Sequence, residues 1–278
     1  MLWHDSKKRK QSLTDLSKVF HDKGYVRTSK KIVKLSNILD LPKTPKDFER
    51  QWIAVGTQFE KDFARGNKFR EQCLDEIARI IVTAIKNIRK IFPKKLLKIY
   101  KLFRNIRIGR DTVGDIGEIV DNLKDPKFAE ERFYLLCFAY LIMVEGIFDD
   151  CVRILYFLWT ASRGTNLTFK KVKEMKVKDI KKEFKKNQFS PIFLRSWKNK
   201  NSLRNSIAHA RFEYNPNNKL MHFKDVNPWT GKVNYDRFLN FNQFAKIGSE
   251  IEDTVEAFLF FFLVLKIRDF ILSPTPYK

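Results

Sequence analysis

Apolar side chains recur every three or four residues along most of this 278-residue chain, which is the spacing of amphipathic helices. In the N-terminal part this spacing predicts helices over residues 1–36, 47–66, 69–91 and 94–107. Pro93 separates the last two, because proline cannot continue a helix without breaking its hydrogen bonds.

The second half of the chain predicts longer and more apolar elements. A helix is expected over residues 128–162, a lysine-rich amphipathic helix over 170–186, and a closing helix over 238–272. Turn-forming residues flank two short alternating runs, which predicts a small β-hairpin over 219–236. The expected fold class is therefore all-α, a helical bundle with one small hairpin.

An acidic, glycine-containing stretch from Gly109 to Pro126 separates these two parts. Because the composition changes there, we predict a basic helical N-terminal region over residues 1–125. A second domain is predicted over residues 126–278.

The charge of the chain narrows the choice of partner. Lysine and arginine total 55 against 32 acidic residues, which gives a net charge of +23 and a pI near 9.9. Such a surface attracts nucleic acid or an anionic membrane. The candidate RNA contacts are Arg211 and seven lysines of the amphipathic stretch: Lys170, Lys171, Lys178, Lys181, Lys182, Lys185 and Lys186. The alternative is that these lysines form only a solvated helix face.

Two uncharged runs, Phe133–Val144 and Ala257–Leu265, are shorter than the roughly 20 residues of a membrane-spanning helix. We therefore expect no membrane insertion. Three cysteines without a pairing pattern and an N-terminus without an apolar signal core favour a reducing, cytoplasmic location.

The common cofactor motifs are absent from the sequence. It has no glycine-rich phosphate loop, no H-E-x-x-H and no paired CxxC, and its four histidines are not closely spaced. No cofactor and no metal site are expected.

The remaining chemical signal is the segment Arg204-Asn205-Ser206-Ile207-Ala208-His209. On a helix that Asn201 or Ser202 could cap, Leu203 and Ile207 would face the core, and Asn205 and His209 would share one face. Arg204 would lie about 140° around the helix from His209.

Arginine, asparagine and histidine suit metal-independent RNA cleavage. Histidine transfers protons near neutral pH, arginine stabilises the negative charge that builds on phosphorus, and an amide positions either group. The alternative for this spacing alone is a structural helix, in which Arg204 pairs with an acid and His209 packs at an interface.

Leu203-Arg-Asn-Ser-Ile-Ala-His-Ala-Arg-Phe-Glu213 resembles the signature of the HEPN superfamily, in which Arg, often followed by Asn, precedes His by four to six residues. The resemblance covers about residues 128–272 and includes the long apolar helix before the motif and the closing helix after it. It implies a helical bundle that dimerises, so that two motifs form one composite cleft.

The resemblance also implies an activity. Many members are metal-independent endoribonucleases of toxin–antitoxin, abortive-infection or antiviral defence systems, and others are inactive RNA- or protein-binding modules. His209 would be the acid/base residue, Arg204 the phosphate binder and Asn205 the positioning amide. An antitoxin or a defence complex would be a partner. Two positions depart from common family patterns: Ala210 replaces a frequent Gly, and Arg211 stands where one subgroup has Tyr.

Two further features concern the surroundings of the motif. Glu145 and Asp149, four residues apart in the long apolar helix, are candidate supporting residues that would need Arg204 or Arg153 as partners. An ordinary solvated helix end is the alternative. The closing helix carries Phe258, Phe260, Phe261 and Phe262, which would pack either against a second copy or against the N-terminal region.

Overall fold

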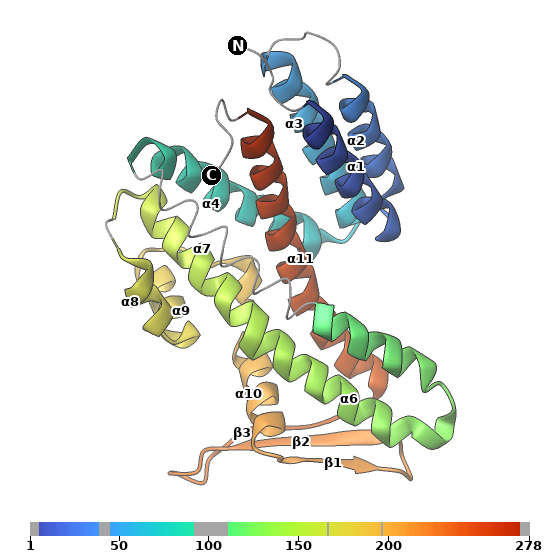
Figure 1. Cartoon of the computed structure of the whole chain (residues 1–278). Helices are drawn as coiled ribbons and strands as arrows, with labels where there is room; N and C mark the ends of the chain where they lie inside the picture. Colours follow the sequence, from blue (N-terminus) through green and yellow to red (C-terminus); the bar gives the residue numbers. More distant parts are fainter. Residues whose placement is uncertain (1–5, 39–44, 92–110, 166, 196, 273–278) are drawn as a thin grey trace. The chain divides into compact units, whose positions relative to one another are not determined.

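The computed structural model describes residues 6–38, 45–91, 111–165, 167–195 and 197–272 (Figure 1). The basic helix predicted over 94–107 lies outside these residues. The contacts divide the chain into two compact units, residues 1–75 with 259–278, and residues 76–258. The boundary predicted at residue 125 stays a prediction.

The first unit is a group of helices. It contains α1 (Ser6–Asp22), α2 (Val26–Ile38), α3 (Pro45–Ala64), the start of α4 (Lys68–Ile91) and the end of α11 (Phe241–Leu272). Its core includes the rings of Phe20, Phe59 and Phe260, which lie against one another. The Asp62 carboxylate accepts hydrogen bonds from the Thr28 backbone N–H and hydroxyl at 2.9 and 2.8 Å, which joins α3 to α2.

The single helix predicted over residues 1–36 was wrong, because this stretch folds as two helices. Gly24 adopts a φ of +76°, which ends α1. The N–H of Gly24 donates to the His21 carbonyl and the N–H of Tyr25 to the Phe20 carbonyl, both at 2.8 Å. This pair of hydrogen bonds is the Schellman motif that terminates many helices at a left-handed glycine.

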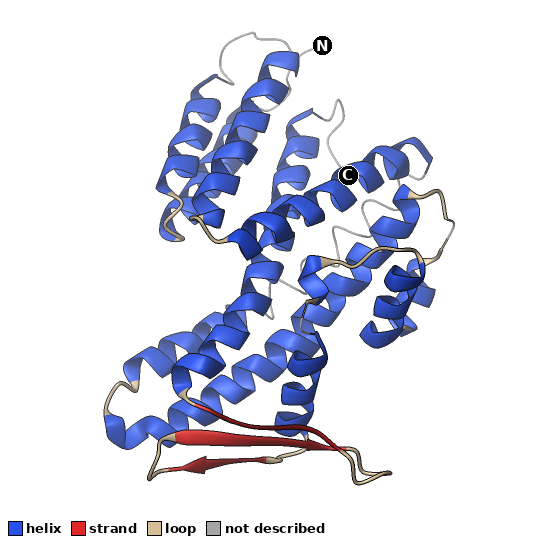
Figure 2. Cartoon of the chain, turned by 180° about the vertical axis from the view of Figure 1, so that it is seen from behind, coloured by secondary structure: helices blue, strands red, loops and turns tan. Residues whose placement is uncertain are grey.

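The second unit combines helices with a small sheet (Figure 2). After a helix over residues 111–122, the chain forms a short 3-10 turn and then one long rod of three segments. These are α6 (Ala129–Leu141), a π-helical segment η2 (Ile142–Phe148) and α7 (Asp149–Ser162). The apolar helix predicted over 128–162 is thereby confirmed, with a π segment that its periodicity did not indicate.

The lysine-rich stretch was predicted as one helix and instead forms two, α8 (Phe169–Glu174) and α9 (Val177–Lys186). Met175 and Lys176 between them are extended. Arg153 Nε donates to the Met175 carbonyl at 3.2 Å, so a contact from α7 fixes the break. Helix propensity along the stretch could not reveal this long-range contact.

The predicted hairpin is part of a three-stranded antiparallel sheet in the order β1-β2-β3. Its strands are β1 (Phe212–Asn215), β2 (Leu220–Val226) and β3 (Val233–Leu239), which Figure 2 shows in red. The fold class is therefore mostly helical with a small sheet, and β1 was missed because it is only four residues long.

Phe238 and Leu239, which were predicted to begin the closing helix, belong to β3. Asn240 and Gln243 exchange side-chain to backbone hydrogen bonds at 2.9 and 3.0 Å and form a capping box that starts α11 at Phe241.

Candidate functional site

The motif lies on α10 (Trp197–Ala208), which follows the short turn η3 (Ile192–Leu194). Leu203 and Ile207 are buried as predicted. The helix begins one turn earlier than predicted, so Asn201 and Ser202 lie inside it and are not its caps. The Asn201 side chain is half-buried and the Ser202 side chain is buried, so neither marks the N-terminus of the helix.

Two contacts hold the middle of α10 in place. The Tyr140 hydroxyl of α6 donates to the Lys200 carbonyl at 3.0 Å. The buried Lys200 ammonium lies 2.9 Å from the Glu250 carboxylate of α11. Helices α6 and α11 therefore fix the position of the motif from two directions.

The end of α10 places His209. The His209 backbone N–H donates to the Asn205 carbonyl at 3.0 Å, so the helical geometry continues through it. Ala210 then adopts a left-handed φ of +50°. The Ala210 and Arg211 N–H groups donate to the Ile207 and Ser206 carbonyls at 3.0 and 2.7 Å, which is again a Schellman motif. His209 thus directly follows Ala208, the last residue of α10, and it is exposed.

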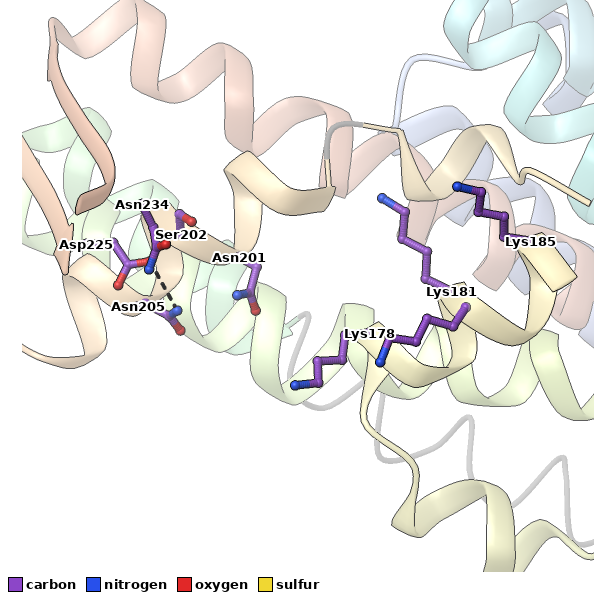
Figure 3. Close-up of a pocket in the computed structure, with 9 residues that line it drawn as sticks. Lys178, Lys181, Lys185, Asn201, Ser202, Asn205, Asp225 and Asn234 are labelled. Carbon is purple, nitrogen blue, oxygen red and sulfur yellow. Dashed lines mark hydrogen bonds between the residues drawn. The ribbon is translucent and has the colours of Figure 1, made fainter. Parts of the chain in front are cut away.

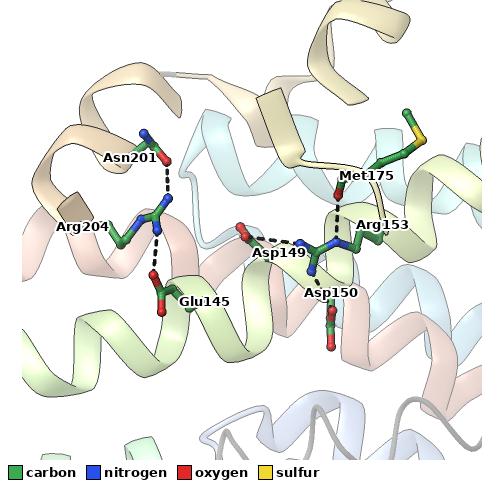
Figure 4. A network of polar contacts seen from close by, with 7 residues as sticks. All are labelled: Glu145, Asp149, Asp150, Arg153, Met175, Asn201 and Arg204. Carbon is green, nitrogen blue, oxygen red and sulfur yellow. Dashed lines mark hydrogen bonds and ion pairs between the residues drawn. The ribbon is translucent and has the colours of Figure 1, made fainter. Parts of the chain in front are cut away.

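Arg204 is held against the long helical rod (Figure 4). Its Nη1 lies 2.6 Å from Glu145 Oε1, and its Nη2 donates to Asn201 Oδ1 at 2.7 Å. The predicted partnership of Arg204 with Glu145 is present, and Glu145 lies in the π-helical segment η2. Such segments insert an extra residue into a turn and change the direction of the side chains around it.

Asp149 follows this segment, is half-buried and lies beside Arg153. Arg153 Nη2 lies 3.8 Å from Asp149 Oδ2, and Arg153 Nη1 lies 2.9 Å from Asp150 Oδ1. Burial raises the pKa of Asp149 to about 6, although the charges of Arg153 and Arg204 lower it. The negative charge of Glu145 adds to the increase in this pKa, because a nearby like charge disfavours the ionised carboxylate.

Asn205 points away from Glu145 toward the sheet. Its amide donates to Asp225 Oδ2 on β2 at 3.5 Å. Both residues line a pocket of about 420 Å³ (Figure 3). The remaining lining residues are polar or basic and come from α9, α10 and β3: Lys178, Lys181, Lys182, Lys185, Asn201, Ser202 and Asn234.

Four of the seven predicted RNA-contacting lysines therefore converge on the pocket with the motif residue Asn205. Lys170, Lys171 and Lys186 are exposed but are not among its lining residues. Lys182 lies 3.5 Å from Asp179 on the same helix. Arg211, the other predicted RNA contact, donates to the Val226 carbonyl and is half-buried.

The structure does not bring all three motif side chains into one site. Arg204 is engaged by Glu145 and Asn201, Asn205 lines the pocket, and His209 is at the exposed end of the helix. Within the described part of the chain, the His209 imidazole has no hydrogen bond or ion pair. One copy of the motif therefore presents its arginine and histidine in different directions.

Sequence reasoning missed Asp225 and Asn234 of the pocket. Asp225 stands on the face of β2 that also carries the buried Met221 and Phe223. Side chains of a strand alternate between its two faces, so Met221, Phe223 and Asp225 share one face. An acidic residue on this otherwise apolar face was the signal in the sequence that could have indicated Asp225 as a site residue.

Comparison with known proteins gives no match: no protein-family model, no curated protein and no solved structure is detectably similar to this chain. Among the described residues, no cluster of three or more His, Cys, Asp and Glu side chains is arranged to hold a metal ion. None of the described helices combines the length and apolar character that crossing a bilayer requires.

Proposed function

We propose that this protein binds RNA and cleaves it as a metal-independent endoribonuclease, in a toxin or antiviral defence setting. The supporting observation is the pocket in which Asn205 of the R-N-x3-H motif lies together with Lys178, Lys181, Lys182 and Lys185. Lysines attract the phosphates of a polyanion, and the adjacent motif contains the residue types that phosphodiester cleavage requires.

In the proposed reaction, His209 accepts or donates the proton, and Arg204 stabilises the charge that builds on phosphorus. The 2′-hydroxyl loses its proton to an imidazole and attacks the neighbouring phosphorus, the bond to the 5′-oxygen breaks, and an imidazolium delivers a proton to that leaving oxygen. The products are a 2′,3′-cyclic phosphate and a 5′-hydroxyl. Asn201 links Arg204 to the pocket, because its side chain lines the pocket and accepts from the guanidinium.

The second candidate is a non-catalytic RNA- or protein-binding module of the same fold. Its specific support is the state of Arg204, whose Nη1 and Nη2 are already engaged by Glu145 and Asn201. An arginine held in this way serves the packing of α10 on η2 without contacting a phosphate.

Incubation of the purified protein with total RNA in EDTA separates the two candidates. We expect cleavage that survives chelation and leaves 2′,3′-cyclic phosphate ends, detected by end-labelling before and after cyclic-phosphate removal. Arg204→Ala and His209→Ala should each lower the cleavage rate by at least about a hundredfold, the usual contribution of an acid–base or charge-stabilising group.

Arg195→Ala and His21→Ala are matched controls, because both side chains are exposed and lie outside the motif. They should cleave like the wild type. Activity that disappears with EDTA, or products with 5′-phosphates, would contradict the mechanism. RNA binding without cleavage by the wild type would support the binding module.

A further inference from the structure

The pocket beside α10 has two chemically different sides (Figure 3). One side consists of lysines from α9, and the other of amide, hydroxyl and carboxylate groups from α10, β2 and β3. Its volume of about 420 Å³ falls at the lower end of the roughly 300–1,000 Å³ typical of small-ligand sites. This is room for a ligand of about the size of a single nucleotide.

Asp225 is the unusual group on the polar side. It is 5% exposed and occupies a core-facing position of β2. Within the described part of the chain, no lysine or arginine forms an ion pair with it, and its side-chain hydrogen bond is the long one from Asn205. A buried carboxylate needs more donors than this, so the pocket presents unused acceptor capacity.

The sheet is irregular at this residue. Asp225 pairs with Tyr235 and Val226 pairs with Val233, so Asn234 is an extra residue of β3 between two paired positions. Such β-bulges redirect a side chain and are frequent beside functional sites. Asn234 lines the pocket next to Asp225, which adds an amide to the same wall.

The two sides together restrict the ligand. A cationic group would satisfy Asp225 but would be repelled by the four lysines. A ligand that joins an anionic phosphate to a neutral group with N–H donors satisfies both sides. Among the bases of RNA, guanine presents two adjacent donors, N1–H and the 2-amino group, which match the two oxygens of one carboxylate.

We infer that this pocket binds a guanine nucleotide of RNA, with its phosphate toward the lysines and its base edge on Asp225. The inference rests on the proposed RNA binding and extends it to a base preference, which is independent of cleavage. Asn205 and Asn234 flank the carboxylate and would position the base.

Fluorescence anisotropy with short labelled oligonucleotides tests this directly. The probes are 2′-fluoro pentanucleotides of uridine with guanine, inosine, adenine or cytosine at the centre, which lack the attacking hydroxyl and cannot be cleaved. The wild type should bind the guanine probe about tenfold more tightly than the adenine probe, the scale of one bidentate base contact. Inosine, which lacks the 2-amino group, should fall between them.

Asp225→Asn should reduce binding of the guanine and inosine probes to the level of the adenine probe and leave the adenine and cytosine affinities unchanged. Asp236→Asn is the matched control, because Asp236 pairs with His222 in the same sheet and does not line the pocket. Lys181→Ala should weaken all four probes alike. If Asp225→Asn does not fold, the comparison of guanine with inosine on the wild type still decides the question.

Equal affinity of the wild type for all four probes, with the Lys181→Ala effect retained, would overturn the base preference and leave RNA binding in place. No binding to any probe would overturn both. A guanine preference in a protein that does not cleave RNA in EDTA would support this inference and reject only the nuclease proposal.

Discussion

At the scale of single residues, the surroundings of the Asp149 carboxyl group determine the pH at which it ionises. This half-buried carboxyl group lies next to Arg153, and its loss of contact with water raises its pKa to about 6 in spite of the positive charges of Arg153 and Arg204. The ordinary pKa of an aspartate in the unfolded chain is near 3.8. Between these two pH values the folded protein binds more protons than the unfolded chain. The contribution of Asp149 to the free energy of unfolding is therefore fully present below about pH 4 and is lost as the pH rises to about 6.

We therefore expect Asp149→Asn to become more stable relative to the wild type as the pH rises from 4 to 7. The relative gain should reach at most about 3 kcal/mol, the value of a shift of roughly two pKa units. Urea unfolding of both proteins at several pH values measures it. A difference that does not change with pH would show that Asp149 is equally easy to ionise in the folded and unfolded states.

Ala210 offers a second test at this scale. It adopts a φ of +50° at the end of α10, where a side chain is strained and glycine is favoured. Ala210→Gly should therefore raise the free energy of unfolding by about 1 kcal/mol. Denaturant unfolding measures the change.

The control is the same substitution two residues earlier, at the last residue of the helix. Ala208→Gly should lower the free energy of unfolding by up to about 1 kcal/mol, because glycine disfavours the helical conformation. Two changes of the same sign would mean that the left-handed turn after His209 is not formed.

At the scale of elements, the periodicity of apolar residues was sufficient to predict the main helices. Helix α4 (Lys68–Ile91) matches the helix predicted over 69–91, and the burial of Leu203 and Ile207 matches the predicted face of α10. These features depend on the local pattern of polar and apolar side chains, which the sequence displays directly.

Other features depend on contacts between distant residues and could not be predicted. The break between α8 and α9 is fixed by Arg153, and the π segment places Glu145 against Arg204. The pocket joins Asp225 to Asn205 from a different element. The sequence therefore indicated part of the candidate site, namely the motif, its acidic partner and the lysines, and the hairpin beside it, but not that Asp225 and Asn234 of this hairpin line the pocket.

Helix α9 leads to a prediction about RNA binding. Val177, Ile180 and Phe184 are buried, and Lys178, Lys181 and Lys185 line the pocket. Replacing these three lysines with alanine should weaken RNA affinity and lower the salt slope by about 2, because each lost phosphate contact releases roughly 0.7 fewer counterions from single strands. Affinity measured over a series of salt concentrations gives both values.

Lys170, Lys171 and Lys186 form the matched control, since their triple substitution removes the same charge outside the pocket. This control should have a clearly smaller effect. Equal effects of the two triple variants would indicate that the lysines act only through the net charge of the protein.

At the scale of the whole molecule, two of the four phenylalanines in the closing helix pack within the chain, and Phe261 is half-buried. Phe258 and Phe260 are buried within the chain, and Phe260 packs against Phe20 and Phe59. The side chain of Phe262 lies outside the described residues. Phe260 therefore favours the interpretation that the closing helix packs on the N-terminal region. The prediction of a homodimer then depends on the motif.

The motif gives a geometric reason for a dimer. Arg204 is held by Glu145 while His209 is exposed at the end of α10, about 140° around the helix from the arginine. A two-fold axis beside α10 would bring Arg204 of one copy to His209 of the other, so that each cleft contains both groups. We therefore expect a homodimer in light scattering and a cleft shared between two copies.

Mixing two inactive variants tests the shared cleft. Arg204→Ala and His209→Ala should each be inactive alone, but after mixing and exchange of subunits they should recover about a quarter of the wild-type rate. Half of the dimers would then be mixed, and each mixed dimer would retain one of its two Arg204–His209 pairs. A double variant mixed with the wild type provides the control for subunit exchange, because it contributes neither group. Cleavage by a protein that remains a monomer, or no recovery of activity after proven exchange of subunits, would show that Arg204 and His209 act within one chain. In that case Arg204 would have to leave Glu145 to reach the same phosphate as His209.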